Sequence, residues 1–311
     1  MTTKTTLAAT VLAVAPLLPA AVLAADLGAV DRPIRLAMLE WSGAQISTQL
    51  AGRVLEQAGY RVEYVTAGNY PHFTGLAEGQ ISASVEIWLN NVGEVFPTVL
   101  AEGRIEDLGS LGLTTREGWI YPAFMQEVCP ALPSWEALAD PACAARLATP
   151  DTLPEGRFLD YPADWGSRAA TIIADNGLPL AAVPSGSEGA MIAELRAAAA
   201  ARTPLVMMFW APHFILAEVE VGWVDLPPCV EDTNERCITA PDVHKVVWSG
   251  FAETWPAAYE ILMAFQVLTE DQQEMMLALD EQRGTLASIA DAWMAGNAAV
   301  WQPWVDAGLN R

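Results

Sequence analysis

The first third of the chain alternates strand-like and helix-like segments, and this alternation constrains the fold more than any other feature. Apolar runs at 34–39 and 81–88, and an alternating apolar pattern at 61–65, predict short strands. Helical spacing at 46–58 and 73–78, each followed by glycine, predicts amphipathic helices between them. Such a series predicts an open α/β sheet whose ligand sites lie beyond the carboxyl ends of the strands.

The same alternation returns further along the chain, so we expect a second sheet. Strands are predicted at 157–159 and 204–210, and helices at 167–176 and 190–201. A later strand and three terminal helices, which we expect to pack on the first lobe, are predicted at 246–248, 256–265, 270–280 and 289–298.

Chain length also indicates two lobes. About 285 residues remain after removal of the N-terminal segment described below, more than one hydrophobic core usually supports. We expect a bilobed α/β fold, with residues 26–116 and 241–311 in lobe 1 and residues 117–240 in lobe 2. Two crossovers between the lobes predict a two-strand hinge that closes around a ligand.

The N-terminus has the parts of a secretory signal peptide. Lys4 supplies a positive charge, residues 7–23 are apolar, and the small residues Ala24 and Ala25 follow. We therefore expect residues 1–25 to be cleaved and the mature protein to be released into the periplasm. Prolines interrupt the apolar run and no cysteine stands at the cleavage point, so neither a membrane span nor a lipid anchor is expected.

The four cysteines form two close pairs in the sequence, Cys129 with Cys143 and Cys229 with Cys237. In an oxidising compartment this spacing predicts two local disulfides. A zinc site would need tighter spacing, such as two cysteines separated by two residues, so no metal is expected there.

The chain has 38 acidic and 16 basic residues, a net charge of -22. Binding of nucleic acid needs a basic face, so nucleic acid is excluded as a partner. We interpret the acidity as an aid to the solubility of an exported protein. The acidic residues within 231–235 offer oxygen ligands for calcium, although a solvated acidic turn is the preferred interpretation.

Tryptophan is in large excess, with 12 residues, and five of them are candidates for one binding site. Trp41, Trp88 and Trp210 follow predicted strands, where side chains point into the crevice of an α/β lobe. Trp165 directly precedes a predicted helix, and Trp119 lies near the expected crossover between the lobes. Several indole faces around one cavity suit a cation that cannot donate hydrogen bonds, such as a quaternary ammonium group.

Core packing is the alternative for any single tryptophan, and it is the preferred interpretation for Trp293, Trp301 and Trp304 in the C-terminal helical region. The turn at Gly166 and Ser167 offers a complement to the indoles, because backbone N–H groups at a helix start bind anions. An ordinary serine N-cap explains the same two residues, and both interpretations stay open.

The chain resembles the substrate-binding proteins of glycine betaine, proline betaine and choline ABC importers over nearly all of its mature length. The matching segments, in order, are 39–41, 73–79, 86–88, 164–167 and 209–213. The resemblance implies a periplasmic-binding-protein fold, a monomer without cofactor, a methylated-ammonium ligand, and the membrane permease subunits of an importer as partners. It also implies that indoles enclose the trimethylammonium group while amides of Gly166 and Ser167 hold a ligand carboxylate.

Departures from the family pattern set the order of expected ligands. Choline-binding members carry an acidic residue shortly after the tryptophan equivalent to Trp41, where this chain has Ser42 and Gly43, so choline is placed third. Trp119 stands where relatives have tyrosine, and an indole-rich box suits the compact trimethylamine N-oxide, which is placed second. Glycine betaine is the first choice. Asn90 and Asn91 replace a proline usual in the family, and their amides are candidates to contact a ligand oxygen.

Two other classes of function were weighed against a methylated-ammonium binding protein. The chain has only three histidines and lacks the H-E-x-x-H and G-x-S-x-G motifs, so an enzyme is not expected. Indole faces also stack on sugars, but sugar sites need many hydroxyl partners. The residues beside Trp41 and Trp210 are mostly small or apolar, which disfavours a sugar ligand.

Overall fold

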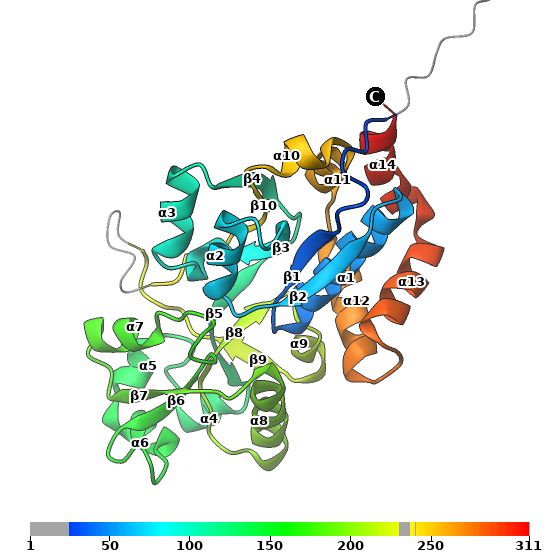
Figure 1. The fold of residues 1–311 in the computed structure, drawn as a ribbon. Coiled ribbons are helices and arrows are strands. Elements are labelled where there is room, and N and C mark those ends of the chain that lie inside the picture. Colours follow the sequence, from blue (N-terminus) through cyan, green and yellow to red (C-terminus); the bar gives the residue numbers. More distant parts are fainter. Residues whose placement is uncertain (1–24, 230–236, 240, 311) are drawn as a thin grey trace, which may run out of the picture.

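The computed structural model describes residues 25–229, 237–239 and 241–310, and it places two five-stranded sheets in separate lobes (Figure 1). The predicted bilobed α/β fold is therefore confirmed. The signal peptide, apart from Ala25, and the acidic turn at 231–235 lie outside the described residues. Within the described ranges, no helix is both long enough and apolar enough to cross a membrane.

The first sheet has the strand order β2-β1-β3-β10-β4. Its first three strands run parallel, whereas β10 runs antiparallel to both of its neighbours. The central strand β3 is buried at every position, because helices cover both faces of the sheet. The strands are β1 (Ile34–Met38), β2 (Val62–Thr66), β3 (Ala83–Trp88), β4 (Ile105–Ser110) and β10 (Val243–Trp248).

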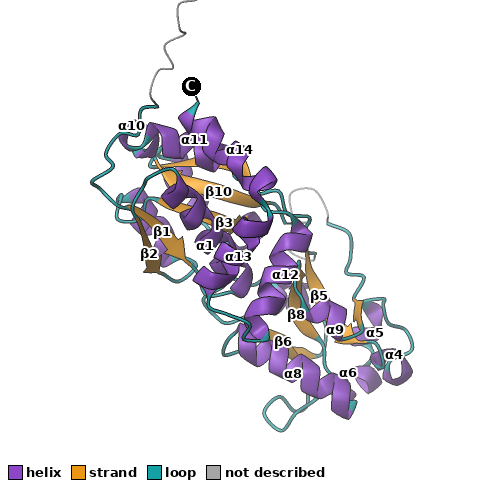
Figure 2. Ribbon diagram, turned by 90° about the vertical axis from the view of Figure 1, so that its right-hand side faces the viewer, coloured by secondary structure: helices purple, strands orange, loops and turns teal. Residues whose placement is uncertain are grey.

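The C-terminal helices pack on this first lobe, as predicted. Helices α12 and α13 lie against α1, and α14 lies against α11 (Figure 2). The helical elements of the lobe are α1 (Ser42–Gln57), α2 (Pro71–Ala77), the 3-10 turn η1 (Leu89–Asn91), α3 (Val95–Ala101), α10 (Phe251–Thr254), α11 (Pro256–Ala264), α12 (Thr269–Asp280), α13 (Leu286–Gly296) and α14 (Ala298–Leu309).

The second sheet has the order β7-β6-β8-β5-β9. Strands β6, β7 and β8 run parallel, and β5 runs antiparallel to β8 and β9. The strands are β5 (Arg116–Pro122), β6 (Gly156–Asp160), β7 (Leu180–Pro184), β8 (Met207–Ala211) and β9 (Val221–Trp223). The helices are α4 (Met125–Val128), α5 (Glu136–Ala139), α6 (Pro141–Leu147), α7 (Ala169–Asp175), α8 (Glu188–Ala201) and α9 (Ile215–Glu218).

The chain passes between the lobes twice, from β4 to β5 and from β9 back to β10. Both predicted disulfides are present, the first within the second lobe and the second in the passage from β9 to β10. Cys129 is bonded to Cys143 with a Cα separation of 5.4 Å, and Cys229 to Cys237 with a Cα separation of 5.2 Å. The first bond ties the end of α4 to α6, so it joins two short helices of the second lobe.

Candidate ligand-binding site

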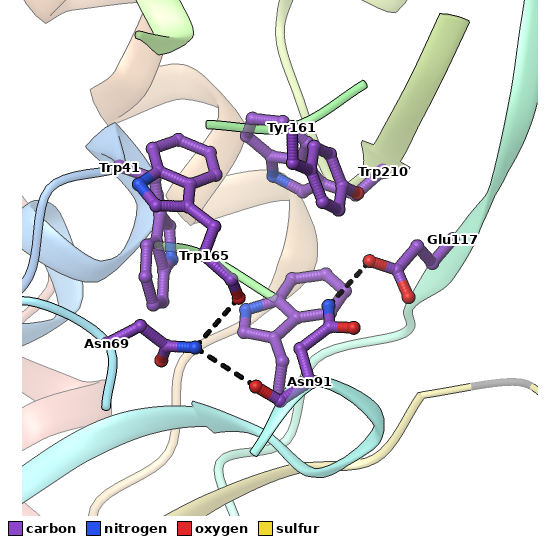
Figure 3. A pocket seen from close by; sticks show the side chains of 8 residues that line it. Trp41, Asn69, Asn91, Glu117, Tyr161, Trp165 and Trp210 are labelled. Atoms are coloured by element: carbon purple, nitrogen blue, oxygen red, sulfur yellow. Dashed lines mark hydrogen bonds between the residues drawn. The ribbon is translucent and has the colours of Figure 1, made fainter. Parts of the chain in front are cut away.

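A cavity lies between the lobes, and each lobe supplies half of its lining (Figure 3). It encloses about 330 Å³, its mouth included. Because this figure counts the open mouth as well, the enclosed space is smaller still, and the cavity suits only a small ligand. The first lobe supplies Trp41, Asn69, Trp88 and Asn91, and the second supplies Glu117, Tyr161, Trp165 and Trp210.

The strand ends explain why these residues meet. Trp88 is the last residue of β3, Trp41 follows β1 closely, and Trp210 is next to last in β8. Tyr161 follows β6 directly, and Trp165 is four residues further on. Carboxyl ends of parallel strands share one edge of a sheet, so in each lobe the aromatic residues gather at the same edge.

The aromatic rings meet edge to face and form the walls of a box. Trp165 lies at the centre of the contacts: its ring centroid is 5.5 Å from that of Trp41 at 64°, and 5.7 Å from that of Trp210 at 71°. Tyr161 is 5.6 Å from Trp210, also at 71°. All of these side chains are buried. Indole faces directed at a shared, desolvated space attract a cation through the negative face of the ring.

Three of the four box indoles turn their N–H groups away to a carboxylate. Trp41 and Trp88 both donate to Oε1 of Glu86, at 2.7 Å and 3.2 Å. Trp165 donates to Oε2 of Glu40 at 3.1 Å. The polar edge of each ring is satisfied behind the wall, which leaves the π faces for the cavity.

One carboxyl group, that of Glu117, lies in the wall of the cavity. Nδ2 of Asn91 donates to its Oε1 at 2.7 Å, and Nδ2 of Asn90 donates to its Oε2. Burial raises the pKa of Glu117, and hydrogen bonds from Asn91, Tyr161 and Asn90 oppose the rise. Burial and the adjacent Glu117 together hold the pKa of Tyr161 well above its ordinary value. Burial therefore biases both groups toward their protonated forms, while the donors around Glu117 favour its carboxylate.

Asn69 joins the two lobes at the floor of the cavity. Its Nδ2 donates to the backbone oxygen of Asn91 at 3.0 Å in its own lobe, and to that of Trp165 at 2.7 Å in the other (Figure 3). The side chain is buried, so both bonds are shielded from water. The position of Trp165 in the box thus depends on a hydrogen bond from the first lobe.

A second set of polar contacts joins the lobes outside the cavity. Glu188, the first residue of α8, accepts from the backbone N–H of Ser42 at 2.9 Å and from its hydroxyl at 2.7 Å. Nε2 of His213, which belongs to the same lobe as Glu188, lies 3.1 Å from its Oε1. Further out, Arg196 on α8 pairs with Asp280 on α12 at 2.8 Å. Charged side chains of the second lobe therefore hold the first lobe in place.

Four of the five tryptophans expected at the site, Trp41, Trp88, Trp165 and Trp210, line the cavity together. The fifth, Trp119, does not: it is fully buried within the second lobe, with its ring centroid 4.5 Å from that of Phe158. The cause is strand direction. Because β5 is antiparallel to β8, its amino end reaches the cavity with Glu117, and Trp119 lies two residues deeper, about 6–7 Å into the core.

Gly166 and Ser167 are next to the cavity but are not among its lining residues. The Ser167 hydroxyl donates to Asp160 Oδ1 at 2.6 Å and accepts from the N–H of Ala169 at 3.0 Å. The hydroxyl thus accepts from the first N–H of α7, although the N-cap position itself is Arg168. Gly166 has φ +81, and a Cβ there would lie 2.5 Å from the Tyr70 hydroxyl oxygen, so glycine is required by conformation and space.

Three lining residues, Asn69, Glu117 and Tyr161, were not found from the sequence, and Asn91 was found only as a candidate amide. Tyr161 carried a usable signal, because it lies two residues after the strand predicted at 157–159. Asn69 follows the strand β2 by three residues and carried a weaker one. Glu117 carried none, since its strand was not predicted and only the antiparallel pairing of β5 brings it to the edge.

Two α/β lobes that enclose a small aromatic cavity define a solute-binding protein for a small organic cation. A family model for the substrate-binding domain of ABC-type glycine betaine transport systems matches residues 32–296. The chain belongs to this family, whose members are substrate-binding components of transporters.

Relatives and solved structures agree with this assignment. A trimethylamine N-oxide-binding protein of Pelagibacter ubique is 30% identical over 285 residues, covering 88% of this chain and 90% of the relative. Lactococcal OpuAC, closed on glycine betaine, superposes with a TM-score of 0.72 at 21% identity, covering 88% of this chain and 100% of that one. An ABC-transporter choline-binding protein with choline gives a TM-score of 0.76 at 18% identity, covering 90% and 93%. The two structures establish the shared fold.

Proposed function

We propose that this chain is the periplasmic binding component of an ABC importer and that its ligand is trimethylamine N-oxide. The observation that carries the choice of ligand is the carboxyl group of Glu117, buried in the wall of a cavity otherwise made of indoles, a phenol and two amides. The relative from Pelagibacter ubique, named for binding trimethylamine N-oxide, supports the same choice.

Glu117 disfavours glycine betaine, which the sequence placed first. A betaine carboxylate in this small cavity would lie close to Glu117, and two carboxylates at short range cannot both stay ionised without a large cost. The backbone N–H groups at Gly166 and Ser167, expected to hold that carboxylate, are outside the lining. Trimethylamine N-oxide has a single oxygen, which accepts a hydrogen bond from a protonated Glu117 while the indoles surround its methyl groups.

Choline is the second candidate, and the same residue favours it. Its hydroxyl can donate to an ionised Glu117, so the acidic partner missing after Trp41 is supplied by another element. The two ligands therefore require opposite protonation states of one carboxyl group, and the pH dependence of binding separates them.

The lobes move relative to one another through the two passages between the sheets, with 26–116 and 241–311 in one lobe and 117–240 in the other. The interlobe bonds of Asn69 and Glu188 are those expected of a closed state. The chain acts as a monomer, exported by residues 1–25, and delivers its ligand to membrane permease subunits. Its role is capture rather than catalysis.

The test is calorimetric titration with trimethylamine N-oxide, glycine betaine, choline and tetramethylammonium between pH 6 and pH 9. We expect trimethylamine N-oxide to bind tightest. Its affinity should be constant where Glu117 is protonated and should fall as pH rises through the raised pKa, by up to about tenfold per pH unit. Choline should show the opposite slope.

Glu117→Gln is the matched variant, because its amide always donates and never ionises. It should bind trimethylamine N-oxide with little dependence on pH and should bind choline more weakly than the wild type does. Tightest binding of glycine betaine by the wild-type protein would contradict the choice of ligand but not the class. Failure of all four compounds to bind would contradict the class.

A further inference from the structure

Glu86 is a buried carboxyl group behind the wall of the box. It lies on β3, two residues before Trp88, and is 1% exposed. It does not line the cavity, and no lysine, arginine or histidine of the described ranges forms an ion pair with it. A carboxyl group so placed needs compensation from hydrogen-bond donors.

Four donors supply that compensation. Oε1 accepts the indole N–H groups of Trp41 and Trp88, at 2.7 Å and 3.2 Å. Oε2 accepts the Ser47 hydroxyl at 2.8 Å and Nε2 of Gln272 at 2.7 Å. Burial raises the pKa of Glu86, and all four hydrogen bonds oppose that rise.

The identity of the donors indicates which form of Glu86 they fit. An indole N–H donates and never accepts, so Oε1 has no acceptor for a proton. Nε2 of Gln272 also faces the backbone oxygen of Gly43 at 3.3 Å and Oγ of Ser47 at 2.9 Å, which fixes the orientation of this amide as a donor. The two indoles and the amide of Gln272 therefore fit a carboxylate, and the Ser47 hydroxyl can donate to it as well.

A repeated pattern connects this carboxylate to ligand binding. Trp165, the box indole of the other lobe nearest to Trp41, also donates its N–H to a carboxylate, that of Glu40. A negative charge at the N–H edge polarises the ring and makes its face more attractive to a cation. In a water-excluded site the field of the carboxylate is also weakly screened.

We propose that Glu86 is a positioning residue that fixes Trp41 and Trp88 in the box and, as their anionic hydrogen-bond acceptor, strengthens the attraction of both indoles for the ligand cation. The inference rests on the proposed function, because it concerns the cationic part of the same ligand. It extends the site beyond the lining residues to a charge that the ligand never touches.

The test compares a cation with an uncharged compound of similar shape. Wild type and Glu86→Gln are titrated with trimethylamine N-oxide, tetramethylammonium and tert-butanol, which has a branched apolar head but no cationic centre. The side-chain amide of this variant keeps an oxygen for both indoles, while its NH₂ group faces the Ser47 hydroxyl, which can accept, and the amide of Gln272, which must turn its oxygen toward it. We expect the variant to lose roughly tenfold in affinity for the two charged-nitrogen compounds and less than twofold for tert-butanol.

Glu106→Gln is the matched control, since it removes one negative charge from β4 in the same sheet, where Glu106 accepts from the Tyr259 hydroxyl. Its affinities should match those of the wild type. An ultraviolet Raman measurement of the indole N–H band should shift in Glu86→Gln alone, because two indoles then donate to a neutral acceptor.

Equal losses for all three compounds would show that Glu86 only supports packing, and no loss would show that it has no role; either result overturns the proposal. If Glu86→Gln does not fold, the double variant Glu86→Gln/Gln272→Glu takes its place. It keeps one carboxylate and one amide in the cluster but moves the carboxylate away from the indole N–H groups. An unchanged preference of this variant for the charged compounds would also overturn the proposal. A wild type that binds none of them contradicts the proposed function itself.

Discussion

The four tryptophans of the cavity are held in different ways. Trp41, Trp88 and Trp165 are anchored by their N–H groups, whereas no side-chain hydrogen bond of Trp210 is formed within the described part of the chain. Trp210 is held by rings: Phe209 is stacked at 4.7 Å and His213 is perpendicular at 5.1 Å. Substitution of Trp210 therefore changes one wall of the box without releasing a buried hydrogen-bond partner.

This makes Trp210 the best position for measuring the contribution of one ring to binding. Trp210→Phe keeps a weaker aromatic face and Trp210→Leu removes it, so affinity for the methylated ligand should fall in that order. The leucine variant should lose roughly thirtyfold, equivalent to about 2 kcal/mol. Isothermal titration measures both variants, with thermal melts to confirm folding.

Trp301→Leu is the control, because Trp301 on α14 donates to the backbone oxygen of Met294 and lies far from the lining. It should lower stability but leave affinity within about twofold. A loss of affinity as large as that of Trp210→Leu would contradict the assignment of Trp210 to the site.

At the scale of elements, the second lobe depends on short helices and a local crosslink. Helices α4 and α6 span only four and seven residues, too short to be stable by themselves. The disulfide between Cys129 and Cys143 joins them across 14 positions of sequence. The helices are thus kept together in the unfolded chain as well as in the folded lobe.

The double variant Cys129→Ser/Cys143→Ser should therefore be destabilised by about 3 kcal/mol, because closing a loop of this length removes that much conformational freedom from the unfolded chain. Denaturant unfolding measures the loss, and the wild type with reduced disulfides should behave similarly. Ligand affinity at low temperature should change little, since neither cysteine lines the cavity. Unchanged unfolding free energy would show that the crosslink does not support this lobe.

For the whole molecule, the interlobe contacts determine how much of the binding free energy goes into closing the lobes. Glu188 makes two of them, from the backbone N–H and the hydroxyl of Ser42, and His213 of its own lobe contacts the same carboxylate. These bonds lie outside the cavity, so they can change affinity without touching the ligand.

Glu188→Ala should weaken ligand binding by at least about tenfold, because even one charge-assisted hydrogen bond lost from the closed state contributes about 1.5 kcal/mol or more. Small-angle scattering should show a larger radius of gyration at ligand concentrations that close the wild type. Glu194→Ala is the control on the same helix, since Glu194 pairs with Arg157 inside the second lobe. Equal affinities for the two variants would show that the Glu188 contacts do not contribute to closure.

The sequence by itself determined β1, β3, β6 and β8, whose carboxyl ends meet at the cavity, together with the two disulfides and the four tryptophans of the box. These are local properties: apolar periodicity, short cysteine spacing, and the position of an indole after a strand. It missed strands such as β4 and β7, because β4 mixes charged with apolar residues and β7 is an edge strand half exposed to solvent.

Only the tertiary structure decided the polar part of the site. Glu117 reaches the cavity because β5 pairs antiparallel with β8, and the same pairing buries Trp119 in the core. Glu86 meets Trp41 across 45 positions of sequence, and Asn69 meets Trp165 across 96. Such contacts depend on strand direction and on how the lobes meet. Both arise from pairings between segments that are distant in sequence, so the pattern of a single segment does not encode them.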